Sequence, residues 1–209
     1  MGEYRRARDL HEDTLIRRKR VLGDDHPDTL TSANSLAFDL NALGEYRRAR
    51  DLHEDTLIRR KRVLGDDHPH TLTSANSLAG DLRGLGEYQQ ARDLHEDTLI
   101  RRKRVLGDDH PHTLTSANSL AIDLRALGEY QQARDLDEDT LTIYKRVLGD
   151  DHPYTLICAH SLAGDLRALG EYQQARDLDE DTFVRRKRVL GDDHPETLAS
   201  AHSLAEWRP

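Results

Sequence analysis

Apolar residues recur in this chain at spacings of three, four and seven positions, in two stretches that repeat every 42 residues. The stretch 45–64 places apolar or small residues along one face, namely Tyr46, Ala49, Leu52, Thr56, Val63 and Leu64. The stretch 69–85 does the same with Leu72, Ala75, Leu78, Ala79, Leu82 and Leu85. Both spacings are those of amphipathic helices, and no stretch alternates as a strand would. The pattern predicts two helices per repeat.

Glycines separate these stretches. One set opens the segment G-E-Y-R/Q-R/Q-A-R-D-L, at Gly2, Gly44, Gly86, Gly128 and Gly170, and a second set opens G-D-D-H-P, at Gly23, Gly65, Gly107, Gly149 and Gly191. A glycine such as Gly65 can close a helix in the left-handed conformation, and Pro69 fits the first turn of the next helix. We expect one domain over residues 1–209, built from units 2–43, 44–85, 86–127, 128–169 and 170–209.

Helical hairpins of this kind bury their apolar stripes only by stacking on their neighbours. The low aromatic content of 5% and the hydrophobic content of 36% suit many small cores shared between neighbours better than one large core. The sequence therefore predicts an all-α fold, an α-solenoid of about ten helices.

The run S-L-A-x-D-L-x-x-L-G-E-Y-x-x-A at residues 77–91 resembles the tetratricopeptide repeat. The small-residue positions of that family match Ala79 and Ala91, its large positions match Leu78 and Leu82, and its G-x-Y matches Gly86 and Tyr88. The unit length and the H-P-x-T-L segment resemble the variety found in kinesin light chains and in bacterial signal-transduction ATPases. The resemblance implies a right-handed superhelix of antiparallel hairpins in which A helices, such as 69–85, line a concave groove. It also implies that each unit here runs from a B helix to an A helix.

This chain departs from the family in the B helix. Where the family prefers a large aromatic residue, the five copies carry His11, His53, His95, Asp137 and Asp179. A second exchange accompanies this one, because the residue 23 positions later is Asn after each His (34, 76, 118) and His after each Asp (160, 202). The pairing predicts a polar contact between one hairpin and the next, formed by Asp137, His160, Asp179 and His202 in the last copies. Duplication of a single ancestral change is the alternative.

The copies differ from one another mainly on one arc of the A helix, about 140° wide at the helical period. After the proline stand Asp28, His70, His112, Tyr154 and Glu196, and further variable positions follow along the same arc. By the resemblance this arc faces the groove, and we expect a peptide- or partner-binding surface made by Thr31, Asn34, Phe38, Asn41, Thr73, Asn76, Arg83, Thr115, Asn118, Ile122, Arg125, His160, Arg167 and His202. Asn side chains offer a donor and an acceptor to an extended backbone, and the three Arg would suit carboxylates. Drift on a solvated face is the alternative.

Charge and cysteine content narrow the classes of partner and compartment. The chain has 31 basic and 39 acidic residues and a net charge of −8, which disfavours nucleic acid or an anionic membrane as partner. The R-R-K-R runs, such as 59–62, spread around a helix among acidic residues and predict solvated ion pairs. One cysteine, Cys158, suits a reducing compartment, and no apolar run is long enough for a membrane span. We expect a cytoplasmic protein.

Candidate chemistry is sparse. Ser and His recur in every unit at the same positions, and no phosphate-binding loop is present in the sequence. The D-D-H-P turns bring His68 and His70 close to carboxylates, but they lack the spaced ligand set of a structural zinc site. Asp in a turn and Pro at a helix start are also ordinary helix-start residues. The sequence predicts no enzyme, no cofactor and no metal.

Two functions remain. The first is an interaction scaffold that binds a peptide or partner segment in the groove, and the resemblance implies the partner-binding portion of a larger bacterial regulator. The second is self-association, because a first B helix and a last A helix without partners are complementary. Tyr4, Leu10, Leu204 and Trp207 would then form the contact between chain ends, or Trp207 would cap the last helix.

Overall fold

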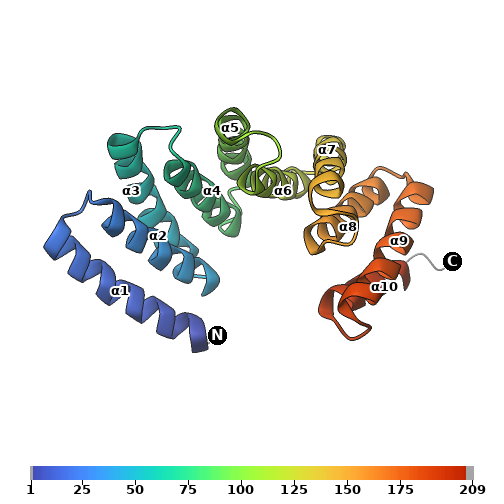
Figure 1. Ribbon diagram of the computed structural model, residues 1–209, viewed down its shortest axis with the longest axis horizontal. Coiled ribbons are helices and arrows are strands. Elements are labelled where there is room, and N and C mark those ends of the chain that lie inside the picture. The colour runs from blue at the N-terminus through green and yellow to red at the C-terminus, as the bar shows by residue number, and fades with distance from the viewer. Residues whose placement is uncertain (1, 206–209) are drawn as a thin grey trace. The chain divides into compact units, whose positions relative to one another are not determined.

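The computed structural model describes residues 2–205, with side chains from residue 4 onward, and this part of the chain forms ten α-helices and no strand (Figure 1). The B helices are α1 (Gly2–Leu22), α3 (Tyr46–Leu64), α5 (Tyr88–Leu106), α7 (Tyr130–Leu148) and α9 (Tyr172–Leu190). The A helices are α2 (Pro27–Ala42), α4 (Pro69–Gly84), α6 (Pro111–Ala126), α8 (Pro153–Ala168) and α10 (Pro195–Ala205). The predicted all-α fold is confirmed. None of the described helices is long and apolar enough to cross a membrane.

The helix boundaries follow from residues of the G-D-D-H-P segment. Pro69 opens α4, and His68 is its N-cap, with its Nδ1 accepting a hydrogen bond of 3.1 Å from the backbone N–H of His70. The same contact recurs at the start of the other A helices, from His26, His110, His152 and His194. The histidine of this segment is therefore a capping residue.

Gly65 closes α3 in a conformation that differs from the expected one. Its φ of 90° is positive, as predicted, but its ψ of 163° lies outside the left-handed helical region. That combination is accessible essentially to glycine alone. The glycine is thus required by the turn itself, between the last helical residue and the two aspartates that follow.

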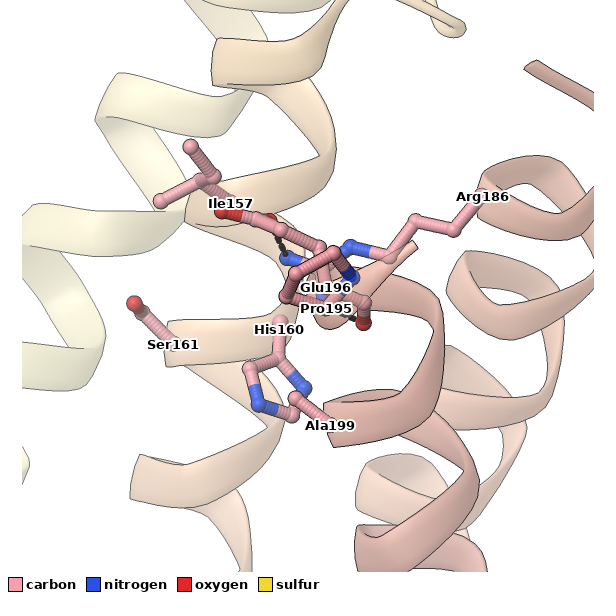
Figure 2. Close-up of a pocket in the computed structure, with 7 residues that line it drawn as sticks. All are labelled: Ile157, His160, Ser161, Arg186, Pro195, Glu196 and Ala199. Carbon is pink, nitrogen blue, oxygen red and sulfur yellow. Dashed lines mark hydrogen bonds and ion pairs between the residues drawn. The ribbon is translucent and has the colours of Figure 1, made fainter. Parts of the chain in front are cut away.

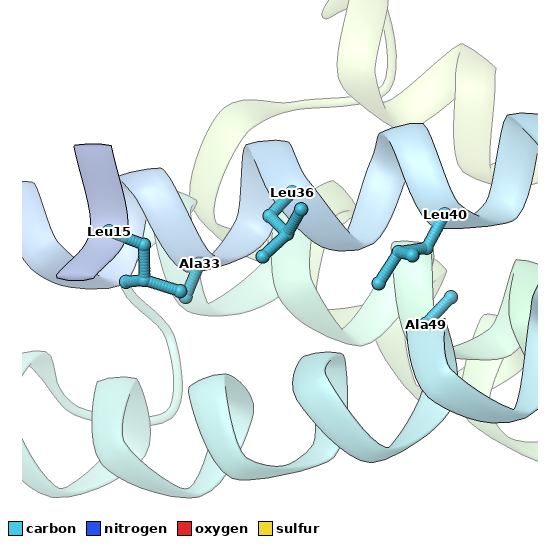
Figure 3. Packing of buried hydrophobic residues seen from close by; sticks show 5 residues of the cluster. All are labelled: Leu15, Ala33, Leu36, Leu40 and Ala49. Atoms are coloured by element: carbon cyan, nitrogen blue, oxygen red, sulfur yellow. The ribbon is translucent and has the colours of Figure 1, made fainter. Parts of the chain in front are cut away.

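The core is the same small cluster built again in the next unit. Leu15, Ala33, Leu36, Leu40 and Ala49 from α1, α2 and α3 are buried together (Figure 3). The equivalent residues 42 positions later, Leu57, Ala75, Leu78, Leu82 and Ala91, form the second cluster. Each cluster draws on three consecutive helices, and α3 contributes to both of them. One residue was predicted wrongly: Val63 is 43% exposed.

The chain divides into two compact units, residues 1–116 and 117–209, and the division falls within α6. In the first unit, α1 to α5 pack in chain order, and the neighbouring A helices α2 and α4 also touch. In the second unit, α7 packs on α8, α8 on α9 and α9 on α10. This serial packing of hairpins is that of an α-solenoid.

Candidate functional site

The residues expected in the groove lie on the A helices, on the side that the cores leave uncovered. Thr31, Phe38, Thr115, Ile122 and His202 are exposed, with Phe38 at 59% and Ile122 at 43%. The others are half-buried: Asn34, Asn41, Thr73, Asn76, Arg83, Asn118, Arg125, His160 and Arg167. We call these fourteen residues the A-helix face.

Three asparagines of the A-helix face form hydrogen bonds with other side chains of the chain. Asn34 Oδ1 accepts hydrogen bonds from Ser74 Oγ at 3.1 Å and from Arg60 Nη1 at 3.4 Å. Asn76 makes the same contact 42 residues later, with Ser116 and Arg102. Asn118 instead donates from Nδ2 to the Tyr144 hydroxyl at 3.0 Å. The amide oxygens of Asn34 and Asn76 therefore tie neighbouring helices together.

Arg60 is a buried residue that sequence reasoning missed. It is only 3% exposed, and its Nη1 donates to the carbonyl of His70 at 2.9 Å and to Ser74 Oγ at 2.8 Å. The equivalent Arg102 makes the same bonds, and burial lowers its pKa to about 10. The prediction of solvated ion pairs is correct for Arg59 and Arg62, which bind Asp25, but wrong for Arg60.

One signal in the sequence does point to this buried contact. Arginine and serine occupy its two ends in four copies, whereas the fourth copy carries Tyr144 and Cys158 there together. Both are buried, at 4% and 2% exposure, and the Tyr144 ring stacks on Tyr154 with centroids 6.2 Å apart. Burial raises the pKa of Tyr144 to about 12 and raises the pKa of the Cys158 thiol as well. The paired exchange replaces a charged contact by a neutral one.

A buried aspartate near the end of the A helix is the second polar contact that the sequence did not reveal. In the first unit, His53 Nδ1 donates to Asp81 Oδ2 at 2.5 Å and Asn41 Nδ2 donates to Asp81 Oδ1 at 2.6 Å. His53 and Asp81 are 1% and 0% exposed. The B-helix histidine thus binds the aspartate 28 residues later, as His11 also binds Asp39, and not the asparagine that its spacing had suggested.

In the second compact unit, residues 117–209, the equivalent contact is built from different residues. Arg125 Nη1 donates to Asp137 Oδ2 at 2.7 Å and to Asp165 Oδ2 at 2.9 Å, so two buried carboxylates share one guanidinium. Burial raises the pKa of Asp165 to about 7; Arg125 opposes this rise and the Asp137 carboxylate adds to it. Burial also raises the pKa of Asp137, again opposed by Arg125. Both aspartates bind the same nitrogen of Arg125, whose side chain is 22% exposed.

The four residues expected to link the last hairpins are only partly brought together in the expected way. His160 on α8 pairs through Nδ1 with Asp179 Oδ1 on α9, at 3.2 Å. Asp137 binds Arg125 instead of a histidine. A contact between hairpins therefore exists, with a different partner for His160 than the spacing suggested.

The second unit also contains a pocket of about 340 Å³ on the A-helix side (Figure 2). Its lining comes from α8, α9 and α10: Ile157, His160, Ser161, Arg186, Pro195, Glu196 and Ala199. Arg186 enters from α9 and meets Glu196, with Nη2 at 2.8 Å from Oε2. The pocket thus combines apolar walls with a guanidinium, a carboxylate and an imidazole.

The residues proposed for self-association differ in exposure. Tyr4 is 44% and Leu10 is 65% exposed, whereas Leu204 is half-buried. Trp207 lies outside the described residues. Among residues 4–205, no group of three or more His, Cys, Asp or Glu side chains is placed to hold a metal ion.

Comparisons with known proteins agree with the repeat seen in the helices. The model of the tetratricopeptide repeat family matches residues 1–57, 28–99, 74–146, 117–183 and 160–208, so its matches extend along the whole chain. No curated protein matches the sequence.

Solved structures show the same fold. The putative kinesin light chain from Podosopora anserina, described as nearly identical TPR-like repeats, is 29% identical over 90% of this chain and 89% of its own, with a TM-score of 0.77. BtubC (BKLC) from P. vanneervenii is 17% identical over 97% of this chain and 82% of its own, with a TM-score of 0.82. Bacillus thuringiensis PlcR, in complex with the peptide PapR7 and DNA, is 17% identical over 97% of this chain and 68% of its own, with a TM-score of 0.71. The chain belongs to the tetratricopeptide repeat family.

Proposed function

We propose that this chain is a protein–protein interaction scaffold that binds an extended segment of a partner protein along its A-helix face. The main observation behind this proposal is the contrast between the core and the A-helix face of the same repeat. The cores of neighbouring units are built from identical residues, whereas the A-helix face changes from copy to copy. Packing explains the first, and recognition of an irregular partner explains the second.

The side chains on this face suit such a partner. Phe38 and Ile122 on this face expose large apolar side chains, and Tyr154, near the start of α8, is 57% exposed. Exposed apolar side chains among polar ones are common features of protein-binding surfaces. Asn34 and Asn76 use their oxygens within the chain, and their Nδ2 groups have no hydrogen-bond partner among residues 4–205. These two amide donors recur one unit apart and would meet carbonyls of an extended backbone.

The family supports the class of function. Tetratricopeptide repeats are generally scaffolds for interactions between proteins. The PlcR structure contains a bound peptide, although its identity with this chain is low enough to support the fold alone. Neither comparison indicates which protein this chain binds.

Selection of peptides from a random display library on the immobilised chain tests the proposal. Ile122→Asp places a charge on the A-helix face, and Val184→Asp places one on α9, where Val184 is 62% exposed. We expect Ile122→Asp to weaken binding of the selected peptides about tenfold or more, which is about 1.4 kcal/mol, and Val184→Asp to leave it unchanged. Equal effects of the two variants, or binding lost only in Val184→Asp, would contradict the assignment of the face.

Self-association is the second candidate, favoured by the exposure of Leu10. Leu10 is 65% exposed, whereas its equivalent Leu52 packs against the first core cluster. Leu10→Asp should then abolish any concentration-dependent rise in mass measured by sedimentation. A mass that stays that of one chain at every concentration would remove this candidate.

A further inference from the structure

The contact between an A helix and the B helix that follows it recurs along the chain. α2 packs on α3, α4 on α5 and α8 on α9. In the first of these contacts, Leu52 of α3 packs against the cluster that includes Ala33 and Leu36 of α2. The Arg60 guanidinium of α3 also reaches α2, where its Nη2 donates to the Leu30 carbonyl at 3.4 Å. The same bond joins the other two pairs of helices, from Arg102 to the Leu72 carbonyl and from Arg186 to the Leu156 carbonyl.

The first helix, α1, exposes the B-helix half of this contact. Leu10 is the equivalent of Leu52, and it is 65% exposed, whereas Leu52 is half-buried. Arg18 is the equivalent of Arg60, and it is half-buried, whereas Arg60 is 3% exposed. The residues that α3 uses to bind α2 therefore lie at the surface in α1.

The last helix, α10, exposes the A-helix half. Leu198 is 55% exposed, whereas the equivalent leucines of the other A helices are 2–3% exposed, namely Leu30, Leu72, Leu114 and Leu156. Ala201 and Leu204, the equivalents of Ala33 and Leu36, are half-buried. One chain thus exposes both halves of an interface that it builds repeatedly within itself.

We propose that α10 of one chain packs on α1 of a second copy, in the way that α2 packs on α3. Leu198 and Leu204 then cover Leu10 of the second copy, and the Arg18 guanidinium of the second copy reaches the Leu198 carbonyl. The two surfaces are different, so the contact is heterologous and joins the chains head to tail. This inference rests on the self-association given above as the second candidate function, and it assigns that association to two specific surfaces.

One polar position distinguishes this contact from the internal ones. In α2–α3 the position is Asn34, whose Oδ1 accepts from the buried arginine at 3.4 Å, and in α8–α9 it is a histidine that binds Asp179. α10 carries His202 at this position, whereas α1 carries His11 where α9 carries Asp179, so neither internal pairing is reproduced. Asparagine at position 202 would supply the amide oxygen for Arg18. His202→Asn should therefore strengthen the association about threefold or more, as one added hydrogen bond does.

Mixing two charge variants tests the inference. Leu10→Asp blocks the surface on α1 and leaves that on α10, whereas Leu198→Asp does the reverse. Both side chains are more than half exposed, so neither substitution buries a charge within the chain, and circular dichroism verifies the folds. In sedimentation we expect the mass of the wild type to rise with concentration and each variant alone to remain a single chain. An equimolar mixture should form a dimer and nothing larger, because one intact surface of each kind remains.

Two further variants complete the test. Val184→Asp places the same charge on α9, where Val184 is 62% exposed, and should associate like the wild type. His202→Asn should lower the concentration at which the mass rises. A mixture of Leu10→Asp and Leu198→Asp that stays monomeric would overturn the head-to-tail contact, and so would weaker association of His202→Asn.

The head-to-tail contact and the second candidate function fail in different ways. If Leu198→Asp associates like the wild type and Leu10→Asp does not, two α1 surfaces meet each other, which retains self-association and overturns the contact with α10. A wild-type chain that stays single at every concentration overturns both. The binding of partner segments to the A-helix face is measured separately, by the peptide selection above.

Discussion

Replacing one buried carboxylate should stabilise this protein at alkaline pH. Asp165 and Asp137 are 0% and 1% exposed, and both bind the same nitrogen of Arg125. One guanidinium balances one carboxylate, so the second is favoured in its protonated form. Asp165→Asn keeps the size of the side chain, supplies a permanent donor and removes the excess negative charge.

The magnitude follows from the pKa of Asp165. That pKa is about 7 against an ordinary 3.8, so ionisation within the fold costs about 4 kcal/mol more than ionisation of the unfolded chain. The folded pKa is raised, so the stabilisation is fully present below the unfolded pKa and is lost as pH rises from about 4 to about 7. Asparagine does not titrate. The variant should therefore match the wild type near pH 4.5 and exceed it by about 2–4 kcal/mol near pH 8.

Urea unfolding of both proteins, followed by circular dichroism at a series of pH values, measures this difference. Asp137 shares Arg125 with Asp165, so the difference between the free energies of unfolding of the two proteins reports the titration of this coupled pair. Repeat proteins can unfold in more than one step, and hydrogen exchange of amides in α7 and α8 provides a local measure.

Asp81→Asn is the matched control, because Asp81 occupies the same position two repeats earlier. Its carboxylate accepts hydrogen bonds from His53 and Asn41, whereas that of Asp165 accepts from Arg125. Removing the charge there weakens the hydrogen bond from His53, so this variant should be destabilised near pH 8. The reasoning is refuted if Asp165→Asn is no more stable than the wild type near pH 8, or if the two variants change stability in the same direction.

Three further variants address the buried arginine, the turn and the cap. Arg102→Ala should destabilise by about 3 kcal/mol, because it removes the hydrogen bonds that Arg102 donates to Ser116 Oγ and to the carbonyls of His112 and Leu72. Arg101→Ala, at an exposed ion pair, should cost less than about 1 kcal/mol in the same urea titration. Gly65→Ala should destabilise by about 1–3 kcal/mol because of its φ of 90°. Gly80→Ala, where an added Cβ meets nothing within 4 Å, should stabilise by up to about 1 kcal/mol. Equal melting-temperature shifts of the two variants would contradict both expectations. His68→Ala should cost about 1 kcal/mol and His68→Asn much less, because asparagine restores the capping acceptor, which thermal denaturation would show.

The sequence was enough to predict most of the fold because each unit repeats the same local signals. The apolar spacing and the Pro69 start gave α3 and α4 to within one residue. Val63 failed because spacing identifies a face but not its edge, where exposure is decided by the neighbouring helix. The ψ of Gly65 failed for a related reason: a glycine at a helix end indicates positive φ but not which turn follows.

The candidate site was harder to predict, because a polar side chain on a helix can either face solvent or form hydrogen bonds with a neighbouring helix. Asn76 and Arg125 lie on the arc that varies between copies, yet they bind within the chain. Arg60 looks like a solvated residue within a basic run, and only the coupled exchange at Tyr144 and Cys158 indicates a buried partner. Spacing along one helix cannot show which residue of another helix lies opposite, and the contacts of Arg125 alone join residues 12 and 40 positions apart.

Exchanges at the buried aspartate should be coupled, because Arg125, Asp137 and Asp165 form one buried contact. The two apolar clusters, by contrast, are built from identical residues and cannot tell one neighbour from another. Asp137→His alone would place an imidazole beside Arg125, and Arg125→Asn alone would leave two buried carboxylates without a cation, at a cost of about 3–5 kcal/mol. The double variant rebuilds the His53–Asp81–Asn41 arrangement of the first unit. We therefore expect it to recover most of the stability lost in Arg125→Asn, by about 2 kcal/mol or more in a double-mutant cycle measured by urea unfolding. Additive effects of the two substitutions would show that the polar residues are interchangeable, and that the order of these near-identical units is not encoded in their buried charges.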